Sequence, residues 1–242
     1  MQTTTETAGT LDDPQAQQVF LEGLLEWYRF FIAQTPEDVA QALDIRRRVY
    51  HDEVGYDVAI PDEYDHRSWF LLAEEVATGK RVGTIRVTPR SEGPLEAEEY
   101  FRLHLPLQSR FSLEVSRFAI LPRYRKGKTF LPVVSLGLFN LTRCFADAMG
   151  FKYLVICSKA ERLWAYEWLR FKRTGLIASY EKLQGALHEL LYLSFDWTEE
   201  VLADHPLRIF IDGTRLPEVH LPETDDPELG LLPGTALAAV GA

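Results

Sequence analysis

The chain has 242 residues, of which 46% are hydrophobic and 26% charged, and this composition suits one globular domain with short extensions. Its 36 acidic and 26 basic side chains give a formal net charge of -10, a surface that repels nucleic acid and anionic lipid headgroups and so excludes both as expected partners. Two cysteines without a CxxC pair and six scattered histidines argue against a disulfide framework and a bound metal.

The N-terminal part predicts a polar extension, a strand and a helix. Residues 1–13 are rich in Thr, Glu and Asp, which predicts disorder, and they lack the basic-then-apolar pattern of a signal peptide. Residues 15–25 have helical apolar spacing, and residues 28–33 are aromatic and β-prone, as in a first strand. The next helix begins at Thr35, with a hydroxyl N-cap, Pro at the first position and acids in the first turn, and should end near Gly55.

The middle of the chain predicts three strands and a long helix. Residues 69–75 and 80–88 read as two strands joined by a turn, and residues 111–120 as a central strand. Residues 131–149 form an apolar helix that stops at Gly150. No run of about 18 apolar residues occurs, so the sequence predicts a cytoplasmic protein without a membrane-spanning segment.

The last part predicts a short strand, an aromatic-rich helix and two strands, followed by an extension. The expected ranges are a strand at 153–157, a helix at 161–173 closed by Gly175 with Trp164 and Trp168 in the core, and strands at 176–180 and 187–195. The order is thus β-α-β-β-β-α-β-α-β-β, an α/β (α+β) domain spanning residues 14–197. Residues 198–242 are expected to form a peripheral extension with a hairpin around Asp212-Gly213 and an acidic tail.

Charged residues in the predicted central strand are the clearest functional signal. Glu114 and Arg117 lie in this strand, where buried charges are costly unless they are paired. On a regular strand they point to opposite faces, so their convergence requires a β-bulge between them, which also frees backbone N–H groups. Ser116 and Phe118 are expected on the face of Glu114.

Further charges are aimed at the same region from other elements. Arg86 lies in the preceding strand, and Asp62 and Asp65 lie in the loop before the strand pair. Arg46 and Tyr50 are four residues apart and share one face of the first helix. With Arg117 and Glu114, the sequence therefore predicts a cluster of three cations and three carboxylates.

These residues together resemble the acyl-homoserine-lactone (autoinducer) synthase family and the related long-chain N-acyl amino acid synthases. The matching pieces are Arg46 with Tyr50 and Tyr56, the pair Asp62 and Asp65, the strand Gly83-Thr-Ile-Arg86, and the strand Glu114-Val-Ser116-Arg117-Phe118. The resemblance implies the GNAT fold, a central mixed β-sheet of about six to seven strands flanked by helices with a β-bulge in the central strand, which agrees with the element order.

The resemblance implies an amide-forming N-acyltransferase that moves a fatty acyl group from an acyl carrier protein or acyl-CoA thioester to an amino acid. Glu114 is the expected general base, and Arg86 and Arg117 are expected to set its ionisation or to bind the acceptor's carboxylate. The expected substrate-binding residues are Arg46, Tyr50, Tyr56, Asp62, Asp65, Ser116 and Phe118. The amine acceptor is a small molecule, and no permanently bound cofactor, metal ion or acyl-enzyme is required.

Two other functions stay open. Homoserine-lactone synthases usually carry Phe and Trp where this chain has Tyr50 and Tyr56, and those aromatics help to hold S-adenosylmethionine. This difference favours the N-acyl amino acid synthases and the exosortase-associated acyltransferases grouped with them over synthesis of a quorum-sensing signal. The third reading is a non-catalytic module of the same fold that binds an acyl carrier.

A basic loop after the central strand is the expected site for the donor. GNAT enzymes bind the phosphates of the pantetheine group here, on a glycine-rich turn, but only Gly127 of that pattern remains. The basic residues are Arg123, Arg125, Lys126 and Lys128 in the loop, and Arg170, Lys172 and Arg173 at the end of the later helix. Two basic groups on an acidic protein suit docking of acyl carrier protein. The acyl chain is expected among Leu136, Phe139, Leu154 and Trp164.

Several of these residues also have a purely structural interpretation. Glu114 and Arg117 are compatible with a simple ion pair, and Asp62 and Asp65 with caps of a loop. At least one arginine of the run 46–48 is expected on a solvated helix face. Tyr166 fits either packing or donation of a proton to the leaving group.

Overall fold

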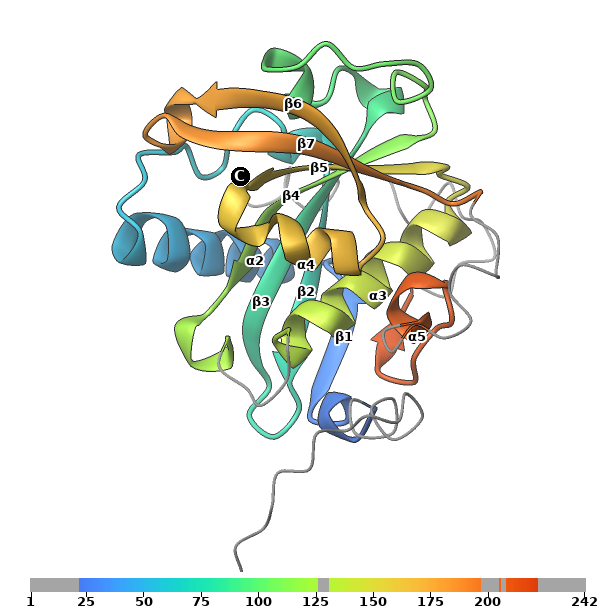
Figure 1. The fold of residues 1–242 in the computed structure, drawn as a ribbon. Helices are drawn as coiled ribbons and strands as arrows, with labels where there is room; N and C mark the ends of the chain where they lie inside the picture. Colours follow the sequence, from blue (N-terminus) through green and yellow to red (C-terminus); the bar gives the residue numbers. More distant parts are fainter. Residues whose placement is uncertain (1–21, 126–130, 197–204, 206–207, 222–242) are drawn as a thin grey trace, which may run out of the picture.

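A computed structural model describes residues 22–125, 131–196, 205 and 208–221 (Figure 1). These residues form one mixed sheet of eight strands in the order β6-β7-β5-β4-β3-β2-β1-β8. The strands are β1 (Tyr28–Ile32), β2 (Trp69–Glu75), β3 (Lys80–Pro89), β4 (Ser112–Ile120), β5 (Tyr153–Lys159), β6 (Lys172–Tyr180), β7 (Ala186–Ser194) and β8 (Val219–His220). The helices of the described part include α2 (Pro36–Arg47), α3 (Val133–Ala148), α4 (Leu163–Trp168) and α5 (Arg208–Ile211).

The strand directions place one parallel pair in the middle of the sheet. β4 and β5 are parallel, β8 is parallel to β1 at the edge, and the other neighbours are antiparallel. The predicted order of strands and helices is confirmed, and β8 adds a strand to the six or seven expected. Among the described helices, none is both long and apolar enough to cross a membrane.

Helix α2 begins as its sequence predicts. The Thr35 hydroxyl accepts a hydrogen bond from the Asp38 N–H at 3.1 Å, and the Asp38 carboxylate accepts one from the Thr35 N–H at 3.4 Å, which completes a capping box around Pro36. The helix continues as a π-helix (Arg48–Glu53), a form frequent at functional sites, and the chain then turns at Gly55, whose φ is 77°. This π-helix carries Tyr50 towards the central strand.

The two long helices cover opposite faces of the sheet (Figure 1). α3 lies close to the sheet because two glycines permit it. A Cβ atom at Gly83 of β3 would lie 3.0 Å from Val134 Cγ1 and 3.3 Å from Leu138 Cδ1 of α3. A Cβ atom at Gly137 of α3 would overlap the ring of Phe30, so this ring occupies the space beside the helix backbone.

Replacing Gly137 with Ala is expected to destabilise the protein by about 1–3 kcal/mol, the usual cost of overpacking a close contact, despite the higher helix propensity of Ala. Urea unfolding measures the effect. Gly23→Ala is the matched control, since a Cβ at Gly23 has no atom within 4 Å. Equal stability of the two variants would contradict the close approach of α3 to Phe30.

The helix after β5 is shorter than predicted. α4 ends at Trp168, Arg170 adopts a left-handed conformation with φ of 65°, and β6 begins at Lys172. Helices often end at a glycine in the left-handed conformation. Here the left-handed residue is an arginine, so no glycine marked the end of the helix in the sequence. The predicted closing residue, Gly175, instead lies within β6.

The predicted burial of two tryptophans on α4 is also wrong. Trp164 is 43% exposed and Trp168 is 40% exposed. The buried residues of this helix are Leu163 and Tyr166, and the Tyr166 ring packs against Phe139 of α3 and against Phe171, which precedes β6. Trp164 therefore does not belong to the buried apolar set with Leu136, Phe139 and Leu154.

Part of the C-terminal extension belongs to the core. Ile209, Phe210 and Ile211 of α5 are buried, and the side-chain amide of Asn140 on α3 donates to the Ile209 carbonyl at 2.7 Å. β8 then pairs with β1, so the predicted hairpin around Asp212-Gly213 is wrong for a segment that forms a short helix and an edge strand. Residues 1–13 and the tail from 222 lie outside the described residues.

Candidate active site

The central strand β4 carries the predicted β-bulge. Thr84 of β3 pairs with Ala119 of β4, but Arg86 pairs with Ser116, so one β3 residue faces the two β4 residues Arg117 and Phe118. Arg117 takes a φ of 51°, which is unusual for a residue with a side chain. The bulge turns the Arg117 side chain towards the carboxylates on the α2 face of the sheet.

β4 and β5 separate beyond Glu114. Within these two fully described strands, the parallel pairing is confined to Ser112–Glu114 with Tyr153–Val155. Five of the residues that follow are only partly buried, which is unusual for the centre of an eight-stranded sheet. We call this region the β4–β5 opening, and its partly exposed residues are Ser116, Arg117 and Phe118 of β4 and Cys157 and Lys159 of β5.

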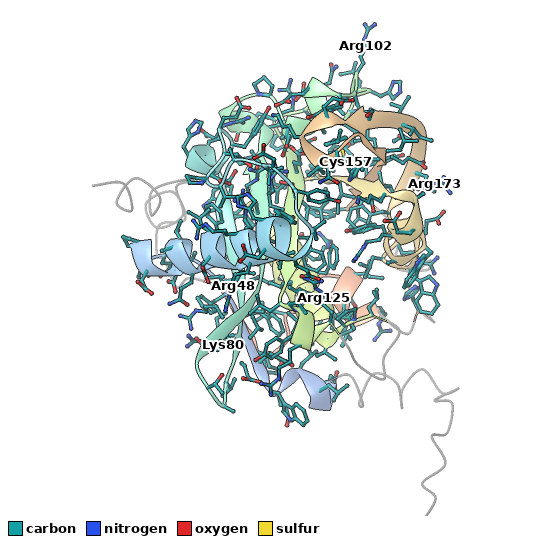
Figure 2. All side chains as sticks on the ribbon, turned by 90° about the vertical axis from the view of Figure 1, so that its left-hand side faces the viewer. Arg48, Lys80, Arg102, Arg125, Cys157 and Arg173 are labelled. Carbon is teal, nitrogen blue, oxygen red and sulfur yellow. The ribbon has the colours of Figure 1, made fainter. Side chains whose placement is uncertain are left out.

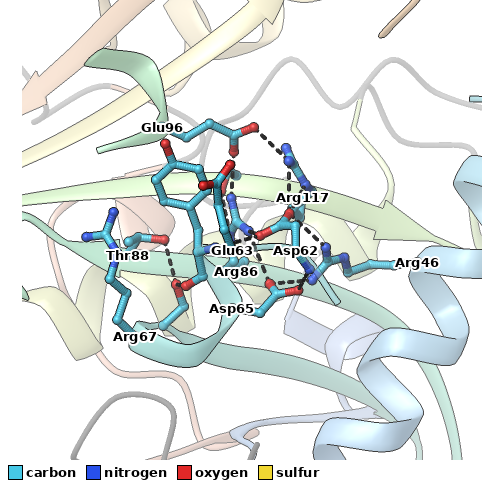
Figure 3. Close-up of polar contacts among 12 residues, drawn as sticks. Arg46, Asp62, Glu63, Asp65, Arg67, Arg86, Thr88, Glu96 and Arg117 are labelled. Carbon is cyan, nitrogen blue, oxygen red and sulfur yellow. Dashed lines mark hydrogen bonds and ion pairs between the residues drawn. The ribbon is translucent and has the colours of Figure 1, made fainter. Parts of the chain in front are cut away.

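Three arginines from three elements meet beside the opening (Figure 3). Arg86 is fully buried and donates to Asp62 Oδ1 at 2.5 Å, Asp65 Oδ1 at 3.1 Å and Glu96 Oε2 at 2.6 Å. Its Nε also donates to the Ser116 hydroxyl at 3.1 Å, across the ladder between β3 and β4. Arg86 is therefore the centre of the cluster.

The other two arginines complete the same network. Arg46 of α2 is fully buried and donates to Asp65 Oδ1 at 2.7 Å and Asp62 Oδ2 at 3.2 Å. Arg117 donates to Asp62 Oδ2 at 3.0 Å and Glu96 Oε1 at 2.6 Å. The exposed neighbours of Arg46 in the run 46–48 only pair with Asp44 on the helix surface, as expected for a solvated face.

Glu114 lies next to this network but is held by backbone groups. Its Oε2 accepts from the Glu96 N–H at 2.7 Å, and its Oε1 accepts from the Ala97 N–H at 3.1 Å. The side chain is 2% exposed. No ion pair joins Glu114 to Arg117, both of which the structure describes, so the simple ion pair considered above is excluded.

The charges of the cluster set two opposite pKa shifts. Burial, reinforced by the charge of Glu96, raises the pKa of Glu114 to about 8, against the opposing effect of Arg86. Burial also acts to raise the pKa of Asp62, but the three arginines outweigh it and lower this pKa to about 2. Three arginines therefore balance the three carboxylates of Asp62, Asp65 and Glu96, and Glu114 is the fourth acid that can take up a proton near neutral pH.

Two tyrosines line the opening on the α2 side. The Tyr50 hydroxyl donates to the Phe118 carbonyl at 3.3 Å, beside the bulge. The Tyr56 ring lies 6.3 Å from the Tyr50 ring, and its hydroxyl accepts a hydrogen bond from Lys159 Nζ. The contacts thus run without a break from the bulge of β4 to the end of β5.

Tyr166 of α4 approaches from the other face of the sheet. It is 8% exposed, and its ring centroid lies 5.9 Å from that of Phe139 and 5.7 Å from that of Phe171. Burial raises the pKa of its hydroxyl to about 12. Tyr166 therefore packs in the core, and its possible proton donation remains a prediction.

The structure brings the predicted catalytic and substrate-binding residues together. Arg46, Tyr50, Tyr56, Asp62, Asp65, Arg86, Glu114, Ser116, Arg117 and Phe118 all lie at the cluster or at the opening. The sequence interpretation missed Glu96 and Lys159. Glu96 lies in the acidic run Glu96–Glu99, which resembles a solvated loop, and the predicted cluster already had three carboxylates for three cations because it included Glu114.

Two of the predicted donor-binding arginines form ion pairs with glutamates. Arg125 forms a bidentate pair with Glu53 at 2.6 and 2.7 Å, and Arg173 pairs with Glu189 at 2.6 Å. These arginines lie in separate regions of the surface (Figure 2), and Arg173 lies on β6 with Lys172 rather than at a helix end. The remaining predicted residues divide into Arg123 and Arg170, which the structure describes, and Lys126 and Lys128, which lie outside the described residues.

The site offers acids and bases but no evident metal ligands. In the part of the chain that the structure describes, no group of three or more His, Cys, Asp or Glu side chains is arranged to hold a metal ion. Both cysteines, Cys144 and Cys157, are free thiols. Burial raises the pKa of Cys157 well above its ordinary value, which disfavours the nucleophilic thiolate at the opening.

The fold and part of the sequence match known acyltransferases. Residues 45–135 match the GNAT acetyltransferase domain, and no curated protein matches the chain significantly. The acyl-homoserine lactone synthase BjaI, a CoA-dependent enzyme solved with SAM and isopentyl-CoA, is 19% identical with a TM-score of 0.58, covering 88% of this chain and 99% of that one. FeeM, an N-acyl amino acid synthase from uncultured soil microbes, is 18% identical with a TM-score of 0.56, covering 69% and 89%.

A third similar solved structure is also an acyltransferase. An acyl-CoA N-acyltransferase from Pseudomonas aeruginosa is 11% identical with a TM-score of 0.53, covering 69% of this chain and 99% of that one. At such low identities the similarity of these structures establishes the fold alone. The match over residues 45–135 and the GNAT fold of the described residues together support an acyl-transferring enzyme.

Proposed function

We propose that this protein is an N-acyl amino acid synthase, which transfers a fatty acyl group from a carrier thioester to the amino group of an amino acid. The main observation in support is Glu114, a buried acid whose pKa is raised to about 8 and which lies beside the point where β4 and β5 separate. A base with a pKa close to the working pH is suited to take a proton from an amine. FeeM, which shares this fold, is an N-acyl amino acid synthase.

The proposed reaction takes place at the β4–β5 opening. The amine nitrogen attacks the thioester carbonyl carbon and forms the C–N bond, and backbone N–H groups at the bulge stabilise the resulting oxyanion. Glu114 accepts the proton of the attacking amine, directly or through a water molecule. The C–S bond then breaks, and the thiolate leaves with a proton, so that an amide and a free thiol are produced.

The arginines have a positioning role in this proposal. The sequence left two roles open for Arg86 and Arg117, and their hydrogen-bond partners among the described residues are Asp62, Asp65, Glu96 and the Ser116 hydroxyl. This pattern supports the first role, in which their charges oppose the rise of the pKa of Glu114 and hold the loop of Glu96 against it. Binding of an acceptor carboxylate by these two guanidinium groups is the less supported role.

We propose acyl carrier protein as the donor, with acyl-CoA as the alternative. The net charge of -10 contrasts with the two predicted basic groups, and a basic group such as that around Arg123 suits contact with an acidic carrier. The pairs of Arg125 with Glu53 and of Arg173 with Glu189 reduce the charge of both predicted patches. The choice of donor therefore depends on direct comparison of the two thioesters.

Synthesis of an acyl-homoserine lactone is the second candidate, and the fold shared with BjaI favours it. S-adenosylmethionine carries a positive sulfonium group, which is best held by aromatic faces or an unpaired carboxylate. The described carboxylates of the cluster are engaged by arginines, and Tyr50 and Tyr56 provide the aromatic faces. A non-catalytic carrier-binding module would have no need for an acid like Glu114.

The product identifies the function. Purified protein is incubated with acyl carrier protein or CoA thioesters of long fatty acids and with either the common amino acids or S-adenosylmethionine, and the products are separated by mass spectrometry. We expect N-acyl amino acids, at a rate that depends on Glu114. An acyl lactone would support the second candidate, and no amide or lactone from any combination would contradict both enzymatic functions.

A further inference from the structure

We propose that Lys159 binds the carboxylate of the acceptor, so that the site selects amines that also carry a carboxylate. This inference rests on the proposed function and assigns its acceptor specificity to one residue. Lys159 is the last residue of β5 and is partly exposed at the β4–β5 opening. The argument depends on its position, its contacts and the charges around it.

The position of Lys159 is level with the bulge. Glu114 of β4 pairs with Val155 of β5, and beyond this pair the two strands continue in the same direction while they separate. Lys159 follows Val155 by four residues, and the bulge residues Arg117 and Phe118 follow Glu114 by three and four. Since both strands rise by about 3.3 Å per residue, Lys159 lies across the opening from the place where the reaction is proposed.

The contacts of Lys159 hold its ammonium group without neutralising it. Its Nζ donates to the Tyr56 hydroxyl and lies 5.2 Å from the centre of the Tyr56 ring. Tyr56 contacts Tyr50, whose hydroxyl is bonded to the Phe118 carbonyl at the bulge. A lysine has three N–H donors, so this arrangement positions the ammonium group and leaves donors for a ligand.

The charges around Lys159 favour an anion. The structure shows no carboxylate of the described residues within ion-pair distance of its Nζ, whereas Arg46, Arg86 and Arg117 are each paired with two or three carboxylates. His188, directly opposite on β7, is largely buried, and this burial lowers its pKa and so favours the uncharged ring. Lys159 is therefore the cation at the opening whose charge is left for a substrate.

An α-amino acid fits this pattern of groups. Its amine must reach the thioester at the bulge, and its carboxylate is attached to the adjacent carbon, on the side where Tyr56 and Lys159 lie. A plain amine or an amino-acid amide has no negative charge for Lys159. The site is thus expected to acylate amino acids in preference to their amides.

The test compares acceptors that differ only in the carboxylate. Protein with a saturating acyl donor is given the common amino acids, or the corresponding amino-acid amides, and the initial rates of acylation are measured. The native protein should prefer amino acids, and Lys159→Met should raise their KM by about tenfold to a hundredfold, as expected for one lost charge-assisted hydrogen bond, without changing the rate with amides. Lys159→Arg should recover part of the preference.

Controls separate this inference from the proposed function. Lys80→Met, at the exposed first residue of β3, should change neither rate, and thermal unfolding should show that all variants fold. Equal acylation of amides and amino acids by the native protein would overturn the inference but leave an N-acyltransferase. A rise of the KM for the acyl donor instead of the acceptor would also overturn it, because Lys159 would then serve the donor's phosphate.

Failure of the proposed function gives a different result. If only S-adenosylmethionine is acylated, the amino acid synthase is excluded, and the same comparison is made with S-adenosylmethionine and its decarboxylated form. If no acceptor turns over, titration calorimetry with the same amino acids and amides without donor provides the readout. Weaker binding of amino acids to Lys159→Met would support the inference, and unchanged binding would overturn it.

Discussion

Replacing Glu114 with Gln is expected to lower kcat by about a hundredfold to ten-thousandfold, the range that general-base catalysis supplies. In the proposed mechanism the carboxylate accepts the amine proton, and an amide has no comparable basicity. The KM for the acyl donor should change little, since Glu114 is buried beside the opening and is not one of the residues that line it. Steady-state kinetics with the acceptor identified by the product assay measures both constants.

The Glu114→Gln substitution is also expected to weaken the hydrogen bonds that hold this side chain. Both oxygens of Glu114 accept backbone N–H groups, from Glu96 and Ala97. In the glutamine variant one oxygen can still accept, but the NH2 group faces the second N–H, which leaves two donors in opposition. Thermal unfolding must therefore accompany the kinetics, with Glu92→Gln at an exposed position as the matched control. Full activity of a folded Glu114→Gln variant would rule out the proposed mechanism.

The pKa of Glu114 predicts how activity depends on pH. With a pKa raised to about 8 by burial and by Glu96, the fraction of ionised carboxylate increases as the pH rises from 6 to 9, so kcat/KM should climb over this range, and the contribution of Glu114 should reach half of its maximum near pH 8. The acceptor amine also loses its proton over this range. The residual rate of Glu114→Gln depends on the amine alone, and the difference between the two profiles isolates the carboxyl group.

The raised pKa of Glu114 changes stability and activity in opposite directions: activity should rise with pH, whereas stability should fall. The pKa of a glutamate in an unfolded chain is about 4.3, so between that value and about 8 the folded protein binds more protons than the unfolded chain. The stability that Glu114 contributes is therefore present at low pH and is lost as the pH rises through about 8. Glu114→Gln should remove this part of the pH dependence.

Local patterns in the sequence were sufficient for most of the fold. Thr35, Pro36 and Asp38 specify a helix start through contacts between near neighbours, and the structure forms that capping box. The bulge was also predictable, because Glu114 and Arg117 cannot share a face on a regular strand. In each case the evidence lies within a few residues of the feature that it predicts.

Features that depend on distant contacts were not predictable in this way. Glu96 reaches Arg86 and Arg117 only because a loop folds over β4, and its own neighbours, Glu98 and Glu99, make the segment look solvated. The end of α4 depends on a left-handed Arg170, for which the sequence gives no glycine signal. Lys159 lies outside the strand predicted at 153–157, and its position at the opening depends on the longer β5 and on the separation of this strand from β4.

Replacing Arg86 with Met should destabilise the folded protein by about 3–5 kcal/mol, the cost of removing one partner from a buried ionic network. Arg86 is fully buried and bonds to Asp62, Asp65 and Glu96, so its loss leaves three carboxylates with only two guanidinium groups. Met occupies a similar volume, so that the lost charge rather than a cavity dominates the effect. Urea unfolding at pH 7 measures the change in free energy.

Two comparisons make this prediction specific to the buried charge. Arg47→Met removes an exposed arginine from its pair with Asp44, which is expected to cost at most about 1 kcal/mol. In Arg86→Met the uncompensated carboxylates gain affinity for protons, so its deficit relative to the native protein should shrink as the pH falls from 7 towards 4. Asp62 illustrates the reason, because Arg86 is first among the three arginines that lower its pKa to about 2 in the native protein. A deficit equal to that of Arg47→Met, or one independent of pH, would mean that the cluster is not the charge-balanced network that holds Glu114 in place.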